Sequence, residues 1–317
     1  MDGVLNIDKP EGWTSHDVVA RVRRLLKQKR VGHTGTLDPF ATGVLVVMVG
    51  RATRLAQFLA SDAKEYLATV RFGYATETGD ATGARLVPAA KDDESGAEGA
   101  GARPWSDAEI EGALASLRGE IEQVPPMYSA RKVGGKKLYE LARRGETIER
   151  EARRVTIYEL EAVRREDGGL LSWSEDGTCD MAFRVRCSAG TYVRVLAESL
   201  GERLQAGAHL TALRRTRAGG FPIEDAVRLD VLEKRAGGGE AASLLTSMDA
   251  ALSGLSFVHL TAEEARRVSH GVPLGLKSGT NYPEGERLRM KDEQGNLLAV
   301  GAYDSRLEVV RPLVVLA

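Results

Sequence analysis

The sequence predicts an α+β protein with a largely antiparallel mixed sheet flanked by helices, followed by a small β-rich domain. Segments that alternate with a period of two are interspersed with segments of helical spacing, without strict βαβ order. Past about Ser253 the sequence changes to short strand-like pieces broken by Gly, Pro and Asp. We therefore place one domain at residues 1–253 and a second at residues 254–317.

The N-terminal elements are a helix and two strands. Thr14 and Asp17 predict a helix start, and apolar residues then recur at helical spacing up to Leu26, with Arg and Lys opposite them. The run VLVVM at 44–48 is apolar throughout, which predicts a central strand covered on both faces. Residues 64–73 alternate as a second strand.

The middle of the chain continues this mixture. Residues 88–104 contain no large apolar side chain and predict a mobile surface insertion. Ser106 and Glu109 form the capping box of a further helix. The other expected elements are a short helix at 136–145, strands at 153–163, 180–188 and 209–221, a loop leading into a helix at 189–204, a flexible stretch at 235–243 and a hairpin turn at 293–296.

Composition narrows the class of protein. The chain has 317 residues, 43% of them hydrophobic, and no run of roughly 20 apolar residues that would span a bilayer. Its N-terminus lacks the form of a signal peptide, so we expect a soluble protein of the cytoplasm. Cys179 and Cys187 fit neither a CxxC pair nor a disulfide framework, and the five histidines are scattered, so we predict no metal site.

Charge is segregated along the chain although the formal net charge is only −1. Residues 9–30 carry seven basic and two acidic side chains, and residues 131–154 carry nine basic and four acidic ones. Residues 92–122 offset them with nine acids and two arginines. Such runs are often solvated faces, but basic runs interleaved with tyrosine and glycine favour a surface that binds a polyanion.

The loop GHTGTLDPFATG, residues 32–43, matches none of the common glycine-rich motifs. It has no lysine and so cannot be a P-loop, and neither GxGxxG nor a GxSxG elbow occurs. Asp38 before Pro39 is common in ordinary turns. The neighbouring glycines, however, leave space beside the carboxylate, which is ionised at neutral pH and could act as a nucleophile. Both interpretations are open on these residues alone.

Several segments together resemble the TruB family of bacterial tRNA pseudouridine synthases. In order, they are LNIDKPEGWTSHDVV, GHTGTLDPFATGVLVVMVGRATRL, PPMYSARKVGGKKLYELARRG, CSAGTYVRVLAESLG and GAHLTALRRT, and they cover nearly the whole chain. The resemblance implies a pseudouridine synthase fold. The C-terminal stretch, with HGVPLG, LLAVGAYD and RPLVVL, is similar to a PUA domain, a small RNA-binding β-barrel.

The resemblance also implies a reaction and three catalytic residues. Asp38 would be the nucleophile that isomerises the uridine at position 55, in the TΨC loop of tRNA, after the base is flipped out of its stack. Tyr66 would stack on the uracil and serve as the proton-shuttling base. Arg194 would pair with Asp38 and lower its pKa. Since the isomerisation needs no electron or group donor, we expect no cofactor.

Four further residues are assigned to binding of tRNA. The resemblance places Tyr192 near the uracil, Leu213 in the wall of its pocket and His33 in the tRNA loop. Lys132 belongs to the basic run 131–154, which we expect to hold the phosphates of the TΨC arm. We expect the pair Lys9-Pro10 to support the Asp38 loop.

Two other functions were weighed against this one. A non-catalytic RNA-folding chaperone would keep the RNA-binding surface, but Asp38, Tyr66 and Arg194 are all present. A guide-dependent pseudouridine synthase would work inside a ribonucleoprotein, and such relatives tend to carry long basic extensions that this sequence lacks. We expect a monomer with no obligatory protein partner and no membrane association.

Overall fold

The structure is a computed structural model of the chain. It describes residues 1–86, 103–129, 132–133, 136–137, 141–142, 144, 146, 148–276 and 282–316. The predicted insertion at 88–104 falls outside these residues except for its last two positions. Half of the predicted helix at 136–145 also lies outside them. Leu141 and Ala142 are helical as expected, but the first two residues form a strand, β7 (Lys136–Lys137), paired with β6 (Lys132–Val133).

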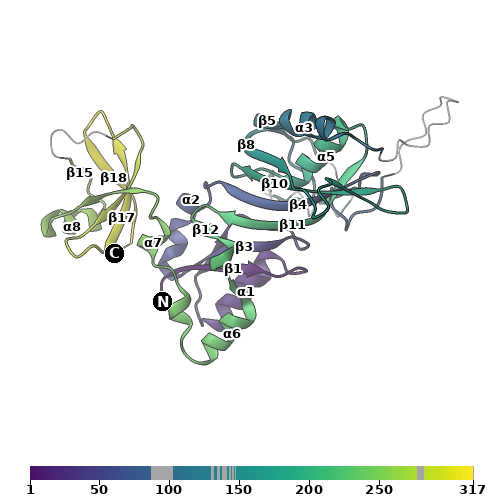
Figure 1. The fold of residues 1–317 in the computed structure, drawn as a ribbon. Coiled ribbons are helices and arrows are strands. Elements are labelled where there is room, and N and C mark those ends of the chain that lie inside the picture. Colours follow the sequence, from purple (N-terminus) through teal and green to yellow (C-terminus); the bar gives the residue numbers. More distant parts are fainter. Residues whose placement is uncertain are drawn as a thin grey trace.

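Most of the described chain is organised around one large mixed sheet (Figure 1). Its main path runs in the order β13-β1-β3-β11-β4-β10-β8-β5, and β3–β11 and β1–β13 are its parallel pairs in the described residues. The predicted largely antiparallel sheet is therefore confirmed. Its strands are β1 (Gly3–Lys9), β2 (Val31–Thr34), β3 (Thr42–Val49), β4 (Lys64–Phe72), β5 (Gly119–Gln123), β8 (Arg153–Ala162), β9 (Leu171–Trp173), β10 (Cys179–Cys187), β11 (Ala208–Ala218), β12 (Phe221–Pro222) and β13 (Val227–Arg228).

Helices cover the two ends of this sheet. The helix α3 (Asp107–Ala115) and the helix α5 (Val193–Arg203) lie near β8 and β11, whereas α1 (Ser15–Leu25) and α6 (Leu229–Gly237) lie near β1 and β2 at the other end (Figure 1). The capping boxes predicted from Thr14 and Ser106 are both present. Short helical pieces follow β3, namely η1 (Gly50–Leu55) and α2 (Ala56–Leu59), and others follow β12 and α6, namely η2 (Ile223–Asp225), η3 (Ala241–Leu244) and α7 (Met248–Ala251).

Two local predictions were wrong and several strands were not predicted. Residues 32–34 were expected to belong to a loop, but they form β2, which pairs with the end of β3. The stretch 235–243, expected to be flexible because of its glycines, holds the end of α6 and the start of η3. Strand β1 was not predicted, and its pairing with β3 places it inside the large sheet.

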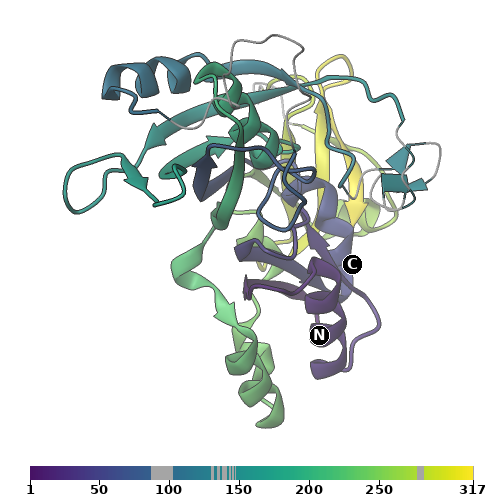
Figure 2. The same ribbon diagram turned by 90° about the vertical axis from the view of Figure 1, so that its right-hand side faces the viewer.

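The C-terminal residues form a second, smaller sheet. Its strands are ordered β14 (Ser256–His259), β16 (Arg287–Lys291), β17 (Leu297–Asp304), β18 (Val309–Val315) and β15 (Leu274–Gly275), with α8 (Ala262–Ser269) packed against β17. The predicted turn between β16 and β17 is confirmed. In the view turned by 90° this curled sheet, in yellow, lies behind the large one (Figure 2).

The two sheets share a hydrophobic core. Val300, Val314 and Leu316 of the C-terminal part are buried in one cluster with Val4 of β1 and Val46 of β3. Polar contacts add to this joint, since Arg51 donates to the main-chain oxygen of Leu316 at 2.7 Å. The C-terminal sheet is thus packed firmly against the strands that carry the site described below. Among the described residues, none of the helices has the length and apolar character needed to cross a membrane.

Candidate active site

Asp38 lies on the short loop between β2 and β3, and the main chain is fixed on both sides of it. On one side, the Oγ of Ser15 in α1 accepts from the N–H of Leu37 at 2.9 Å and lies 3.2 Å from its carbonyl oxygen. On the other side, the Nζ of Lys9 donates to the carbonyl of Pro39 at 3.2 Å. The loop therefore presents the Asp38 carboxylate from a rigid base.

Lys9 is completely buried and serves several carbonyl groups at once. Its ammonium also donates to the oxygens of Pro10 at 2.9 Å and Trp13 at 2.6 Å. Burial lowers the pKa of Lys9 to about 8, and the nearby Asp38 opposes that shift. The prediction that Lys9 supports the loop is confirmed by these contacts.

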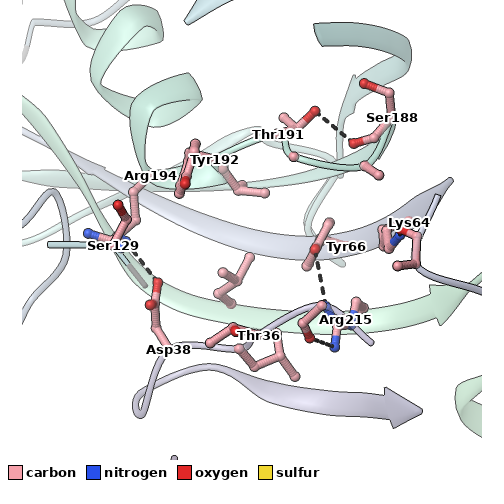
Figure 3. Close-up of a pocket in the computed structure, with 17 residues that line it drawn as sticks. Thr36, Asp38, Lys64, Tyr66, Ser129, Ser188, Thr191, Tyr192, Arg194 and Arg215 are labelled. Atoms are coloured by element: carbon pink, nitrogen blue, oxygen red, sulfur yellow. Dashed lines mark hydrogen bonds and ion pairs between the residues drawn. The ribbon is translucent and has the colours of Figure 1, made fainter. Parts of the chain in front are cut away.

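An ion pair joins Asp38 to the helix α5. The Nε of Arg194 donates to Oδ2 of Asp38 at 2.9 Å (Figure 3). The same guanidinium donates to the main-chain oxygens of Thr78 at 2.6 Å and Tyr128 at 2.7 Å, and it lies 3.9 Å from a second buried carboxylate, Asp80. Because each nitrogen of the guanidinium donates a hydrogen bond, the guanidinium is fixed in place, and Arg194 can hold Asp38 in one orientation.

The electrostatic balance at Asp38 differs from the expectation. Burial raises the pKa of the Asp38 carboxyl, whereas the Arg194 guanidinium lowers it and offsets only part of that effect. The loss of hydration thus outweighs the pairing that was expected to dominate. The side chain of Asp38 nevertheless keeps 33% of its surface exposed, so the carboxylate is accessible from the pocket.

Aromatic and apolar side chains come to the same pocket from neighbouring strands. Tyr66 on β4 and Leu213 on β11 are buried and point to the same side of the sheet, because β4 and β11 pair in register there. Burial raises the pKa of the Tyr66 phenol. Tyr192 precedes α5, and the side-chain amide of Gln123 accepts from its N–H at 3.0 Å and donates to its oxygen at 3.3 Å.

These residues line a single cavity of ≈ 300 Å³, at the lower end of the size range for ligand pockets. Asp38 and Arg194 lie at one end of it in Figure 3, and Tyr66 lies nearer the middle. An accessible carboxylate, a fixed cation and an aromatic wall can together hold a planar ring beside a nucleophile. The five predicted residues that the structure brings together here are Asp38, Tyr66, Tyr192, Arg194 and Leu213.

Two predicted residues are not among those that line the cavity. His33 lies on β2 opposite Val47, where burial lowers its pKa and leaves its Nδ1 without a hydrogen-bond partner in the described residues. Lys132 lies on β6, and its side chain is outside the described residues. Both residues stay predictions as contacts to RNA.

The sequence analysis missed several residues of the site. Arg215 and Lys64 line the cavity, Asp80 lies beside Arg194, and Gln123 holds Tyr192. A signal for the first two was available, because Arg215 is two residues from Leu213 and Lys64 is two residues from Tyr66. Residues two apart on a strand face the same side.

Comparisons with known proteins show the family of the chain. The model of the TruB family pseudouridylate synthase N-terminal domain matches residues 23–193, and that of the tRNA pseudouridylate synthase B C-terminal domain matches residues 194–253. The tRNA pseudouridine synthase B of Geobacillus thermodenitrificans is 44% identical over 315 residues, which cover 99% of each chain. That of Thermobifida fusca is 45% identical over 100% of this chain and 99% of its own.

Solved structures share the same architecture. The chain of a Cbf5-Nop10-Gar1 complex superposes with a TM-score of 0.70 at 25% identity, over 99% of this chain and 85% of that one. An archaeal box H/ACA sRNP Nop10-Cbf5 complex gives a TM-score of 0.68 at 25% identity, over 99% and 86% of the two chains. The predicted pseudouridine synthase fold is confirmed by this similarity. From the two family models and the relatives that match over their whole length, the chain belongs to the TruB family of pseudouridylate synthases, isomerases that convert uridine to pseudouridine.

Proposed function

We propose that this isomerase acts on tRNA and converts the uridine at position 55 of the TΨC loop. Relatives named tRNA pseudouridine synthase B match over nearly their whole length, which supports tRNA as the substrate. Position 55 rests on the resemblance of the loop that carries Asp38. The proposed isomerisation by Asp38 is supported chiefly by one observation, the ion pair of Asp38 with Arg194 inside an accessible cavity.

The reaction requires a flipped base and a covalent anchor. Uracil cannot react while it is stacked, so the enzyme must extrude it at a cost of a few kcal/mol, which stacking on aromatic rings partly recovers. The N1–C1′ bond breaks and a C5–C1′ bond forms on the same ribose, after which the C5 proton leaves. Asp38 is the group that forms the transient bond, at C1′ or at C6.

The neighbours of Asp38 suit this task. Arg194 orients the carboxylate and favours its ionised form against the effect of burial. Tyr66 lines the same cavity, and we assign to it the ring on which uracil stacks and the uptake of the C5 proton. Leu213 and Tyr192 complete the wall around the base. The redox state of the substrate does not change, so these residues suffice in principle.

Substrate binding outside the cavity involves the two basic regions and the C-terminal sheet. We assign phosphate contacts to Lys132 and the basic run around it, a contact with the extruded loop to His33, and additional RNA surface to the PUA-like C-terminal sheet of residues 254–317. A monomer acting in the cytoplasm fits this assignment. A guide-dependent enzyme is the second candidate, because the similar Cbf5 chains were solved in complexes with Nop10 and other partners.

Substitution of the nucleophile tests the proposal. Asp38→Asn should abolish tritium release from C5-labelled tRNA transcript, while the Kd for that tRNA stays within a few-fold because the phosphate contacts lie elsewhere. Asp230→Asn, at an exposed carboxylate, is the matched control and should keep the rate. Turnover near wild type in Asp38→Asn would refute the nucleophile. A purified protein that is inactive until a guide RNA is added would favour the second candidate.

A further inference from the structure

Two buried cations line the cavity at a distance from the Asp38–Arg194 pair. Arg215 is 1% exposed, and its guanidinium donates to the main-chain oxygens of Val44 at 2.6 Å and Gly35 at 3.0 Å. Lys64 is 5% exposed, and its ammonium donates to the oxygen of Ala60 at 2.6 Å. Both residues belong to the lining of the cavity.

In the described part of the chain, these two cations lie side by side and neither forms an ion pair with a carboxylate. A Cβ atom built on Gly35 would lie 3.4 Å from Nη1 of Arg215 and 3.8 Å from Cε of Lys64, so the two side chains flank the same residue. Within the described part of the chain, neither makes an ion pair with a carboxylate, although Asp62 is near enough to act on Lys64 electrostatically. Buried charges are normally paired, and two adjacent like charges without a partner are costly. Such an arrangement indicates that an anion is expected there.

Tyr66 does not supply this anion in the resting enzyme. Its hydroxyl lies 3.5 Å from Nη1 of Arg215, but burial raises the pKa of the phenol and keeps it neutral. In Figure 3, Asp38 lies at one end of the cavity and Lys64 at the other, with Tyr66 and Arg215 between the two. A uracil that stacks on Tyr66 with its ribose toward Asp38 therefore turns its far edge toward the cations.

We propose that Arg215 and Lys64 form an anion-stabilising end of the pocket, which holds the negative charge that develops on the uracil carbonyl oxygens during the reaction. The inference rests on the proposed function and deepens it. When the C1′–N1 bond breaks, its electron pair stays with the base and spreads over O2 and O4, while C1′ bonds to the Asp38 oxygen. If Asp38 attacks C6 instead, the displaced electron pair moves to O4. On either route negative charge reaches O4, the carbonyl oxygen on the edge opposite N1, where preorganised cations stabilise a transition state most.

Lys64 is the residue with which to test this inference, because Arg215 also holds the main chain of two loops. In single-turnover assays with tRNA transcript, Lys64→Met should lower the rate constant at least tenfold and leave the Kd within twofold. Lys64→Arg should recover part of the rate, because a cation returns. Lys234→Met is the matched control, the same substitution at an exposed lysine of α6 outside the cavity lining and the two basic regions, and should keep the rate.

A substrate with a better leaving group provides a second readout. Fluorine at C5 withdraws electrons and stabilises the uracil anion, so tRNA that contains 5-fluorouridine should depend less on the cation. The fold-loss caused by Lys64→Met in cleavage of the C1′–N1 bond should therefore be smaller with this tRNA than with uridine. A purely structural role of Lys64 would give the same loss for both substrates.

The outcomes separate this inference from the proposed function. If Lys64→Met has the rate of wild type, or loses the same factor on both substrates, the inference is overturned. The proposed function still stands in that case, because the wild-type enzyme turns over its tRNA. A weaker Kd with a reduced salt dependence and an unchanged rate would show that Lys64 contacts a phosphate, which also overturns the inference. Turnover by Asp38→Asn would instead refute the proposed function. If Lys64→Met does not fold, the same comparison is made with Lys64→Arg. Its fold-loss in rate is measured on tRNA with uridine and on tRNA with 5-fluorouridine, and equal losses would overturn the inference.

Discussion

The cost of keeping Lys64 charged inside the pocket can be measured as protein stability. Burial, followed by the neighbouring Arg215, lowers the pKa of Lys64 from 10.5 to about 8. At pH 7 the unfolded chain therefore binds this proton more tightly, and the folded protein is less stable by about 3 kcal/mol on this account. As the pH rises from about 8 to about 10.5, the folded state loses the proton first and the cost shrinks, to about 1 kcal/mol at pH 10. Stability should thus rise with pH through this window.

The measurement compares wild type with Lys64→Met by urea unfolding at about pH 7, 8.5 and 10. Methionine removes the charge and keeps the volume of the side chain. Relative to wild type, the free energy of unfolding of the variant should therefore be higher at pH 7, and this advantage should shrink by about 2 kcal/mol between pH 7 and pH 10. The lost hydrogen bonds to Ala60 and Asp62 add a constant offset. Cys187 faces Lys64, and burial raises the pKa of its thiol to about 11. Because Cys187 is present in both proteins, its effect on the pH dependence largely cancels in the difference between them. A difference that does not change with pH would refute the reasoning.

Three further substitutions test the frame of the site. Gly43→Ala should lower the free energy of unfolding by at least about 3 kcal/mol, because φ is +98° there and a Cβ would lie 2.2 Å from the main-chain oxygen of Arg215; an unchanged melting temperature would contradict this. Gln123→Leu removes both hydrogen bonds to the main chain of Tyr192 and should reduce the single-turnover rate several-fold with little change in Kd, whereas an equal loss in both would point to misfolding. Arg194→Lys keeps the charge but loses the hydrogen bonds that anchor the guanidinium to Thr78 and Tyr128 and should slow turnover about tenfold or more, and full activity would show that this anchoring is dispensable.

The site residues that could be predicted from the sequence are those that lie in a recognisable local pattern, such as a loop motif or a regular strand or helix period. Asp38 lies in a distinctive loop, Tyr66 in a strand of clear alternation, and Arg194 at the start of a helix whose apolar face is periodic. Each prediction needed only the local period and the family motif. Asp38 and Tyr66 meet because β11 pairs with β3 in parallel and with β4 antiparallel, and Arg194 joins them because α5 packs against β11.

The strand period places Arg215 and Lys64 on the face of Leu213 and Tyr66, but their burial depends on contacts with strands that are remote in sequence. Arg215 and Lys64 are charged residues in strands, and such residues ordinarily face solvent. They are buried here because β4 and β11 pair in a register that turns them, like Tyr66, toward the cavity. The state of Asp38 was misjudged for a similar reason, since desolvation by the folded surroundings outweighs the visible cation at Arg194. Strand β1 escaped prediction because its partners are remote in sequence.

The joint between the two sheets links strands that are far apart in the sequence. Val4 and Val46 are covered by Val314 and Leu316, so this apolar layer of the large sheet is incomplete until residues 314–316 have been synthesised. During synthesis, one apolar surface of strands β1 and β3 therefore stays exposed to water, where it can form non-native contacts or aggregate. The N-terminal strands and the C-terminal sheet should consequently acquire their native packing together, after translation of this segment ends.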